Sequence, residues 1–208
     1  MTEERERILG WRLWRIREGF LGSWALNHDW MPGPNRAKCL SPNTARCSNA
    51  PGRHCRCGFW GLHSPLQCLT RARYGGMGWW PVMGLMRGWG TVAVHGDEGF
   101  RAENASVVCL FSDWPFMPRE MRLGGGRWTR WWRLLSLLME GETDPPPPDQ
   151  NDRRLALRDT ADRYGVPLVS LSDSIRLGLL EELDVGREAV DELKTWLAVG
   201  PWGKYPTR

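Results

Sequence analysis

Four cysteines of this 208-residue chain lie close together in sequence, at spacings that suit a bound metal ion. They follow the pattern Cys-x7-Cys-x7-Cys-x-Cys, and Gly58 comes directly after the last of them. Zinc takes four ligands in a tetrahedron, and thiolate sulfur is among its preferred ligands. The Cys-x-Cys pair can face one ion only if the chain turns tightly, and a glycine supplies the backbone freedom for that turn. We therefore predict a structural Zn2+ site with the ligands Cys39, Cys47, Cys55 and Cys57.

Alternatives to four thiolates around zinc remain open. His54 and His63 are reserve ligands, because imidazole nitrogen also binds zinc. Four separate buried thiols would need no metal, but residues 35–58 are rich in Pro and Gly and offer no core for them. A disulfide between Cys55 and Cys57 would be strained. Because such a segment buries too little surface to order itself, the metal is expected to supply the missing stabilisation.

A second group of residues that could take part in catalysis surrounds the expected turn at residues 96–99. His95 precedes the turn, and Arg101 and Glu103 follow it on the facing strand. An imidazole and a carboxylate could serve as acid and base in a hydrolase or nuclease. The alternative is a hairpin with ordinary cross-strand polar pairs, and no nucleophile or phosphate-binding loop accompanies the three residues.

A third group combines arginine with tryptophan in the sequence Arg-Trp-Thr-Arg-Trp-Trp-Arg at residues 127–133. Tryptophan rings stack on bases and arginines neutralise phosphates, so this segment is a candidate surface for nucleic acid or a protein partner. The alternative is a helix whose tryptophans are buried while its arginines reach the solvent. The candidate surface residues are Arg127, Trp128, Arg130, Trp131 and Arg133.

The composition favours a globular protein inside the cell. Hydrophobic residues make up 41% of the chain and charged residues 25%. No run of about 18 apolar residues exists, so no membrane span is expected. The charged start of the chain lacks the apolar core of a secretory signal, and we expect a cytoplasmic location. In that reducing compartment, cysteines serve metal binding more readily than disulfides. The net charge of +4 permits a phosphate-binding surface without establishing one.

The hydrophobic pattern predicts the elements that must position these residues. Its clearest feature is a strand–turn–strand unit from residue 89 to residue 111. Ser172 or Asp173 is the expected cap of the helix that begins at residue 175. Further strands are expected at 11–17 and 20–26, and helices at 59–73, 127–139, 152–164, 175–183 and 185–197.

The predicted fold class is α+β, in three parts. A β-rich, zinc-stapled domain covers residues 1–140, and a proline-rich linker covers residues 141–152, where a run of prolines makes the chain stiff and extended. A helical C-terminal segment follows at residues 153–208. We expect this segment either to pack back onto the first domain or to bind a partner.

Several short motifs of the chain carry a resemblance to one group of proteins. They are residues 10–15, 30–33, 37–39, 50–51, 55–59, 89–92, 99–103 and 164–167. Together they resemble a family of uncharacterised proteins from actinobacteria and their phages. In that family the position of Cys47 is often His, which also suits a metal ligand. The resemblance implies a zinc-binding Cys-x-Cys-Gly motif and an actinobacterial or phage origin, and it carries no activity to transfer.

The sequence therefore predicts a zinc-stabilised, non-enzymatic binding or regulatory module. Its expected target is nucleic acid or a protein that handles nucleic acid. One alternative is a protein-interaction factor that inhibits a host machine, which the proline-rich linker and the 14 tryptophans would suit. Another is a hydrolase or nuclease that uses His95 and Glu103.

Overall fold

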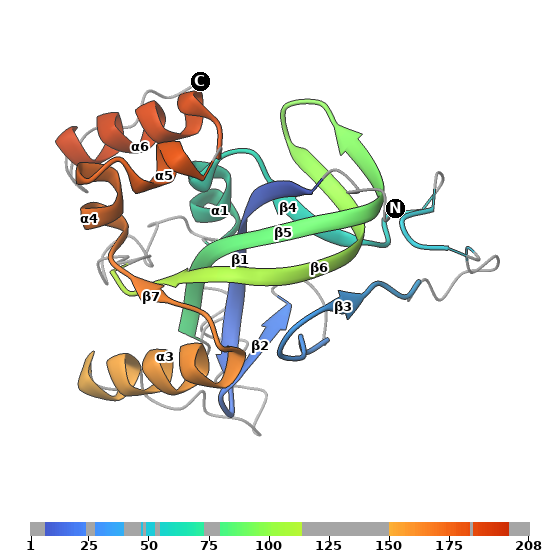
Figure 1. Ribbon diagram of the computed structural model, residues 1–208, viewed down its shortest axis with the longest axis horizontal. Helices are drawn as coiled ribbons and strands as arrows, with labels where there is room; N and C mark the ends of the chain where they lie inside the picture. The colour runs from blue at the N-terminus through green and yellow to red at the C-terminus, as the bar shows by residue number, and fades with distance from the viewer. Residues whose placement is uncertain are drawn as a thin grey trace, which may run out of the picture.

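The computed structural model describes residues 7–23, 28–39, 47, 49–52, 55–72, 80–113, 150–183 and 185–199. These residues form a seven-stranded mixed sheet with short helices on both sides, so the predicted α+β class is confirmed (Figure 1). The strands are β1 (Ile8–Arg17), β2 (Phe20–Ser23), β3 (Asn35–Arg36), β4 (Phe59–Leu62), β5 (Trp80–His95), β6 (Gly99–Phe111) and β7 (Leu168–Val169). The helices are α1 (Pro65–Ala72), α3 (Gln150–Tyr164), α4 (Leu171–Arg176), α5 (Leu179–Glu182) and α6 (Arg187–Val199).

Four strands of the sheet close into a ring of antiparallel pairings. β1 pairs with β5, β5 with β6 and β6 with β4. β4 returns to β1 through the pair Trp11–Leu62. The pairing of β5 with β6 shifts register after Leu85 and again after Trp89, and such irregularities bend and twist a strand. The two long strands can therefore curl around and reach both neighbours.

The ring of Phe100, on β6, fills the space inside this closed sheet and is fully buried. A Cβ atom at Gly61 of β4 would lie 2.5 Å from the Phe100 ring. Cβ atoms at Gly10 of β1 and Gly88 of β5 would lie 2.6 and 2.7 Å from it. Three strands therefore carry glycine where one aromatic side chain needs the room.

β1 is buried on both faces of the sheet. Because successive side chains of a strand point to opposite faces, its residues divide between two hydrophobic clusters. Trp11 and Leu13 lie in the cluster that includes α4, α5 and α6. Trp14 and Ile16 lie in the cluster that includes α3. Figure 1 shows the same division, with α3 on one side of the long strands and α4–α6 on the other.

The helical C-terminal segment packs against the β-rich part of the chain, which is one of the two roles predicted for it. α3 is anchored by Tyr164, whose hydroxyl donates to Trp30 O at 2.5 Å and accepts from the Leu21 N–H at 2.9 Å. Gly165, with φ of 62°, ends the helix where the pattern predicted. β7 then joins the sheet parallel to β6.

The strand–turn–strand prediction for residues 89–111 is confirmed, although β5 begins earlier, at Trp80. The single helix predicted over residues 59–73 is wrong in its first part. There β4 pairs with β6, and this tertiary pairing overrides the helical spacing of the leucines. α1 begins only at Pro65, a residue that suits the first turn of a helix.

The predicted cap of the helix after β7 is also corrected. α4 begins at Leu171, earlier than expected, and its cap is Ser170 rather than Ser172 or Asp173. The Ser170 hydroxyl accepts a hydrogen bond from the Asp173 N–H at 3.1 Å. The helix predicted at 127–139 and the proline run of the linker lie outside the described residues.

Candidate metal centre

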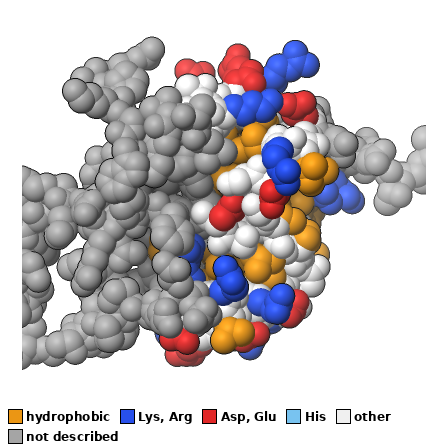
Figure 2. All heavy atoms as spheres, turned by 90° about the vertical axis from the view of Figure 1, so that its left-hand side faces the viewer, with side chains coloured by type: hydrophobic (Ala, Val, Ile, Leu, Met, Phe, Trp, Pro, Cys, Tyr) orange, Lys and Arg blue, Asp and Glu red, His pale blue; other side chains and the backbone are white. Residues whose placement is uncertain are grey.

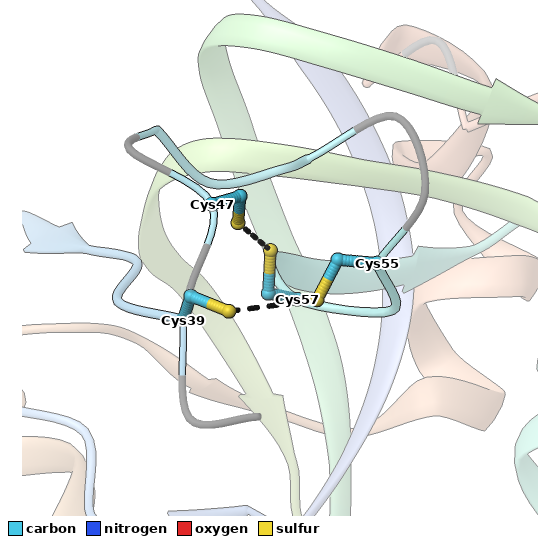
Figure 3. A group of neighbouring side chains, drawn as sticks. All are labelled: Cys39, Cys47, Cys55 and Cys57. Carbon is cyan, nitrogen blue, oxygen red and sulfur yellow. Dashed lines mark hydrogen bonds between the residues drawn. The ribbon is translucent and has the colours of Figure 1, made fainter. Parts of the chain in front are cut away.

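The four cysteines of the predicted site converge from separate points of the chain, and their side chains point toward one another (Figure 3). All four Sγ atoms lie within 4.8 Å of one another. The Sγ atoms of Cys39 and Cys55 are 3.5 Å apart, and those of Cys47 and Cys57 are 3.1 Å apart. A tetrahedron with metal–sulfur bonds of about 2.3 Å places its sulfurs about 3.8 Å apart. The two closest separations are slightly shorter than that value and none exceeds 4.8 Å, so small side-chain adjustments would let the four thiols hold one four-coordinate metal ion.

Cys39 reaches the cluster from β3. The Ala37 N–H donates to Glu103 O at 2.7 Å, which ties the chain to β6 just before the cysteine. Asn35 is buried, and its side-chain amide both accepts from the Met31 N–H and donates to Met31 O, each at 2.8 Å. This turn fixes the direction in which the chain approaches the metal site.

Two glycines allow the tight path of the chain around the Cys-x-Cys pair. Gly58 has φ of 114°, in the region that favours glycine, as the sequence predicts. Gly52 lies against the cluster itself, because a Cβ there would lie 2.8 Å from Cys47 Sγ. Its N–H also donates to Cys57 Sγ at 3.2 Å. The sequence prediction missed Gly52, although Pro-Gly is a known turn signal.

Without the charge of a cation, crowding disfavours ionisation of these thiols. The hydrogen bond with Cys57, followed by burial and the nearby Cys39, raises the pKa of Cys47 to about 12. The thiolate is the form that binds metal, so a divalent cation must supply the charge that lets four neighbours ionise together. The pKa of Cys55 is raised as well, so by themselves Cys47 and Cys55 are poor nucleophiles, which fits a ligand role.

Arg101 joins the metal-binding loop to the sheet and is only 3% exposed. Its Nη1 donates to Cys55 O and, at 3.0 Å, to Cys57 O. Its Nε donates to His95 Nε2 at 2.6 Å. The guanidinium lies 5.6 Å from the centre of the Trp60 ring, and that ring lies 4.8 Å from the His95 ring. One buried side chain of β6 thus holds the backbone of both ligands in the Cys-x-Cys pair.

Of the three candidate catalytic residues, His95 and Arg101 bond to each other, whereas Glu103 has other partners. His95 Nε2 accepts the hydrogen bond from Arg101, so this nitrogen is already engaged. Glu103 lies further along the hairpin, where Oε2 accepts from the N–H and hydroxyl of Thr91 at 3.2 and 3.1 Å. Its Oε1 lies 3.3 Å from Nη2 of Arg36. This arrangement corresponds to cross-strand pairing rather than to an acid–base pair of His95 and Glu103.

The other predicted site residues lie elsewhere. The His63 ring packs 6.4 Å from Phe100, while the metal-ligand cluster found among the described residues consists of the four cysteines alone. Cys68 and Cys109 are buried in the cluster beneath α4–α6, and burial raises the pKa of Cys109 to about 11. Those two thiols serve as core. His54 and the segment 127–133 lie outside the described residues.

In comparisons with protein-family models, curated proteins and solved structures, no match to the chain was found. None of the described helices is long and apolar enough to cross a membrane.

Proposed function

We propose that the chain is a zinc-stabilised, non-enzymatic binding module in which the ion orders residues 31–58. The observation that carries the proposal is the convergence of four thiols on a common centre. Four thiolates complete the tetrahedral shell of zinc and leave no position for water or substrate, as in structural zinc sites. Such a site needs reduced cysteines, which suits the cytoplasm of a cell or of a phage-infected host.

Nucleic acid is the target that we propose for this module. Lys38 and Arg56 are exposed, and each is the sequence neighbour of a metal ligand. Half-buried Trp60 lies close to Arg56, because its indole N–H donates to Arg56 O at 3.4 Å. Cations next to an aromatic ring can neutralise phosphates and stack a base. The basic and aromatic segment 127–133 would extend this surface.

The face that carries α3–α6 is less suited to binding nucleic acid. Its described part mixes Lys and Arg with Asp and Glu and with apolar side chains (Figure 2). A surface of mixed sign gives no net attraction for a polyanion. The proposed nucleic-acid surface is therefore the metal-binding loop, and α3 offers exposed arginines that serve as controls.

The proposed zinc site is tested on protein purified under reducing conditions. Elemental analysis is expected to find one zinc per chain, and replacement by Co2+ should give the absorption spectrum of a tetrahedral tetrathiolate site. Cys57→Ser should reduce metal content, whereas Cys109→Ala, which removes a core thiol, should retain it. A wild-type protein that stays fully folded in a strong chelator and holds no metal would refute the proposal.

Nucleic-acid binding is tested by fluorescence anisotropy with labelled single-stranded and duplex DNA and RNA at about 50 and 200 mM salt. Binding should weaken steeply with salt. Lys38→Gln with Arg56→Gln should weaken it for all sequences and lower the salt slope by about 2. The control removes the same charge from α3, with Arg154→Gln and Arg158→Gln, both exposed. If no probe binds, the target is a protein rather than nucleic acid.

A further inference from the structure

We propose that Arg101 is the buried counter-charge of the metal centre and sets its affinity for the ion. This inference rests on the proposed function, because it assigns a positioning residue to the same site. The guanidinium charge of Arg101 has no counter-ion among the described residues. A guanidinium stays protonated at any ordinary pH, and Arg101 is 3% exposed.

A buried cation is costly unless an opposite charge or a full set of acceptors compensates it. Across the part of the chain that the structure describes, no carboxylate forms an ion pair with Arg101. Its acceptors are the carbonyl oxygens of Cys55 and Cys57 and the Nε2 atom of His95. All three acceptors are uncharged: two are carbonyl oxygens and one is an imidazole nitrogen. They satisfy donors, but they supply no negative charge.

The negative charge is supplied next to those carbonyls when the metal binds. Four thiolates around one divalent ion carry a net charge of about −2. Arg101 contacts the peptide groups of two of the four ligands, so its charge lies beside the centre, in a site sheltered from solvent screening. The buried cation and the anionic centre therefore stabilise each other.

The guanidinium also orients the ligands. Nη1 holds two carbonyls that are two residues apart, which fixes the turn that aims Cys55 and Cys57 at one point. β6 and the Trp60 ring hold the guanidinium in turn. Groups that orient metal ligands in this way typically change affinity by about 10- to 100-fold when they are replaced.

The test measures zinc affinity by competition with a chelator of known affinity, on variants whose folding is checked by circular dichroism. Arg101→Gln, which removes the charge, should lower affinity about 10- to 100-fold. Arg101→Lys keeps the charge but loses the planar fork, and it should lower affinity by less. Arg87→Gln is the matched control, because Arg87 is a half-buried arginine of β5 that should leave affinity unchanged.

A thermal melt with zinc and with chelator separates this role from ordinary packing. Arg101→Gln should destabilise the zinc-loaded protein more than the metal-free protein, because only the loaded state holds the anionic centre. Equal destabilisation of both states, with unchanged affinity, would overturn the inference while leaving the metal site in place. Should Arg101→Gln not fold, Arg101→Met, which keeps the apolar stem without the charge, is measured instead, and wild-type affinity in that variant would overturn the inference. A wild-type protein without metal would instead refute the proposed function.

Discussion

At the scale of single residues, the tightest packing is around the ring of Phe100. Gly61→Ala would place a methyl group 2.5 Å from that ring, and the closed sheet leaves neither group room to move aside. We expect the variant to lose about 1–3 kcal/mol of unfolding free energy. Urea denaturation followed by tryptophan fluorescence measures this loss.

A double-mutant cycle shows whether the ring of Phe100 is the cause. Phe100→Leu removes part of the ring, so the added methyl group of Gly61→Ala should cost less in that background. The two changes together should be milder than the sum of their separate effects by about 1 kcal/mol. Strict additivity would mean that the backbone of β4, and not Phe100, excludes the methyl group.

Tyr164 supports a second prediction at this scale. Its hydroxyl satisfies both the Leu21 N–H and Trp30 O in a buried setting, where burial raises the pKa of the phenol. Tyr164→Phe leaves both groups without that partner, and we expect a loss of about 1–3 kcal/mol in unfolding free energy. Arg158→Ala, on the exposed side of α3, should change it by less than about 0.5 kcal/mol. Similar losses in the two variants would contradict the role assigned to the hydroxyl.

Sequence reasoning succeeded for residues whose chemistry is local. The cysteines were predicted as a set because their type and spacing suit one ion, and Gly58 because a tight turn needs it. Arg101 was predicted only as a candidate catalytic residue beside His95 and Glu103, and not as a partner of the metal site. Its hydrogen bonds to Cys55 O and Cys57 O join residues that are 46 and 44 positions apart in the sequence. They depend on the pairing of β4 with β6. A sequence pattern does not contain that pairing.

At the scale of elements, Asp113 connects the end of β6 to the start of α4. Its carboxylate accepts from the Leu171 N–H at 2.6 Å, the Ser172 N–H at 3.1 Å and the Ser170 hydroxyl at 3.0 Å. Burial favours the neutral carboxyl, but these hydrogen bonds together outweigh it and hold the pKa of Asp113 below its usual value. Asp113→Asn should therefore cost about 1–2 kcal/mol of unfolding free energy at pH 7.

The effect of Asp113→Asn should depend on pH. A carboxylate with a lowered pKa in the folded state stabilises the fold above its unfolded pKa and loses that contribution as pH falls through the folded value. The difference between wild type and Asp113→Asn should thus shrink progressively as pH falls below about 5. Asp173→Asn is the control, because that side chain is exposed in a surface ion pair with Arg176. A difference in unfolding free energy that stays constant as pH falls would show that the charge of Asp113 is not the cause.

Elements with a strong local pattern were predicted, and those set by distant partners were not. The β5–β6 hairpin has its own turn residues at 96–99, and α3 ends at its own stop signal, Gly165. β4 was mistaken for helix because Leu62 and Leu66 have helical spacing, whereas its pairing with β6 decides its conformation. The closed ring of strands was not predicted at all, because β1 meets β4 and β5 only through contacts distant in sequence.

At the scale of the whole molecule, the metal is expected to divide the chain into two parts of different stability. β1, β5 and β6 have extensive pairing and two hydrophobic clusters. Among its described residues, the segment that carries the cysteines is fixed by the pairing of β3 with β6 and by few buried side chains, among them Ala50 and the preceding Trp30. Removal of the metal should therefore loosen residues 31–58 first.

Hydrogen exchange with and without a chelator tests this division. Without zinc, the amides of Ala37 and Gly52, which donate to Glu103 O and Cys57 Sγ, should exchange much faster. The amides of β1 and β5 should keep more of their protection, because their ladder does not include the metal loop. Free zinc at 100 times its Kd should raise the unfolding free energy by about 2.7 kcal/mol. Cys57→Ser should reproduce the chelator pattern in the presence of zinc, and uniform protection in every condition would show that the loop orders itself without the ion.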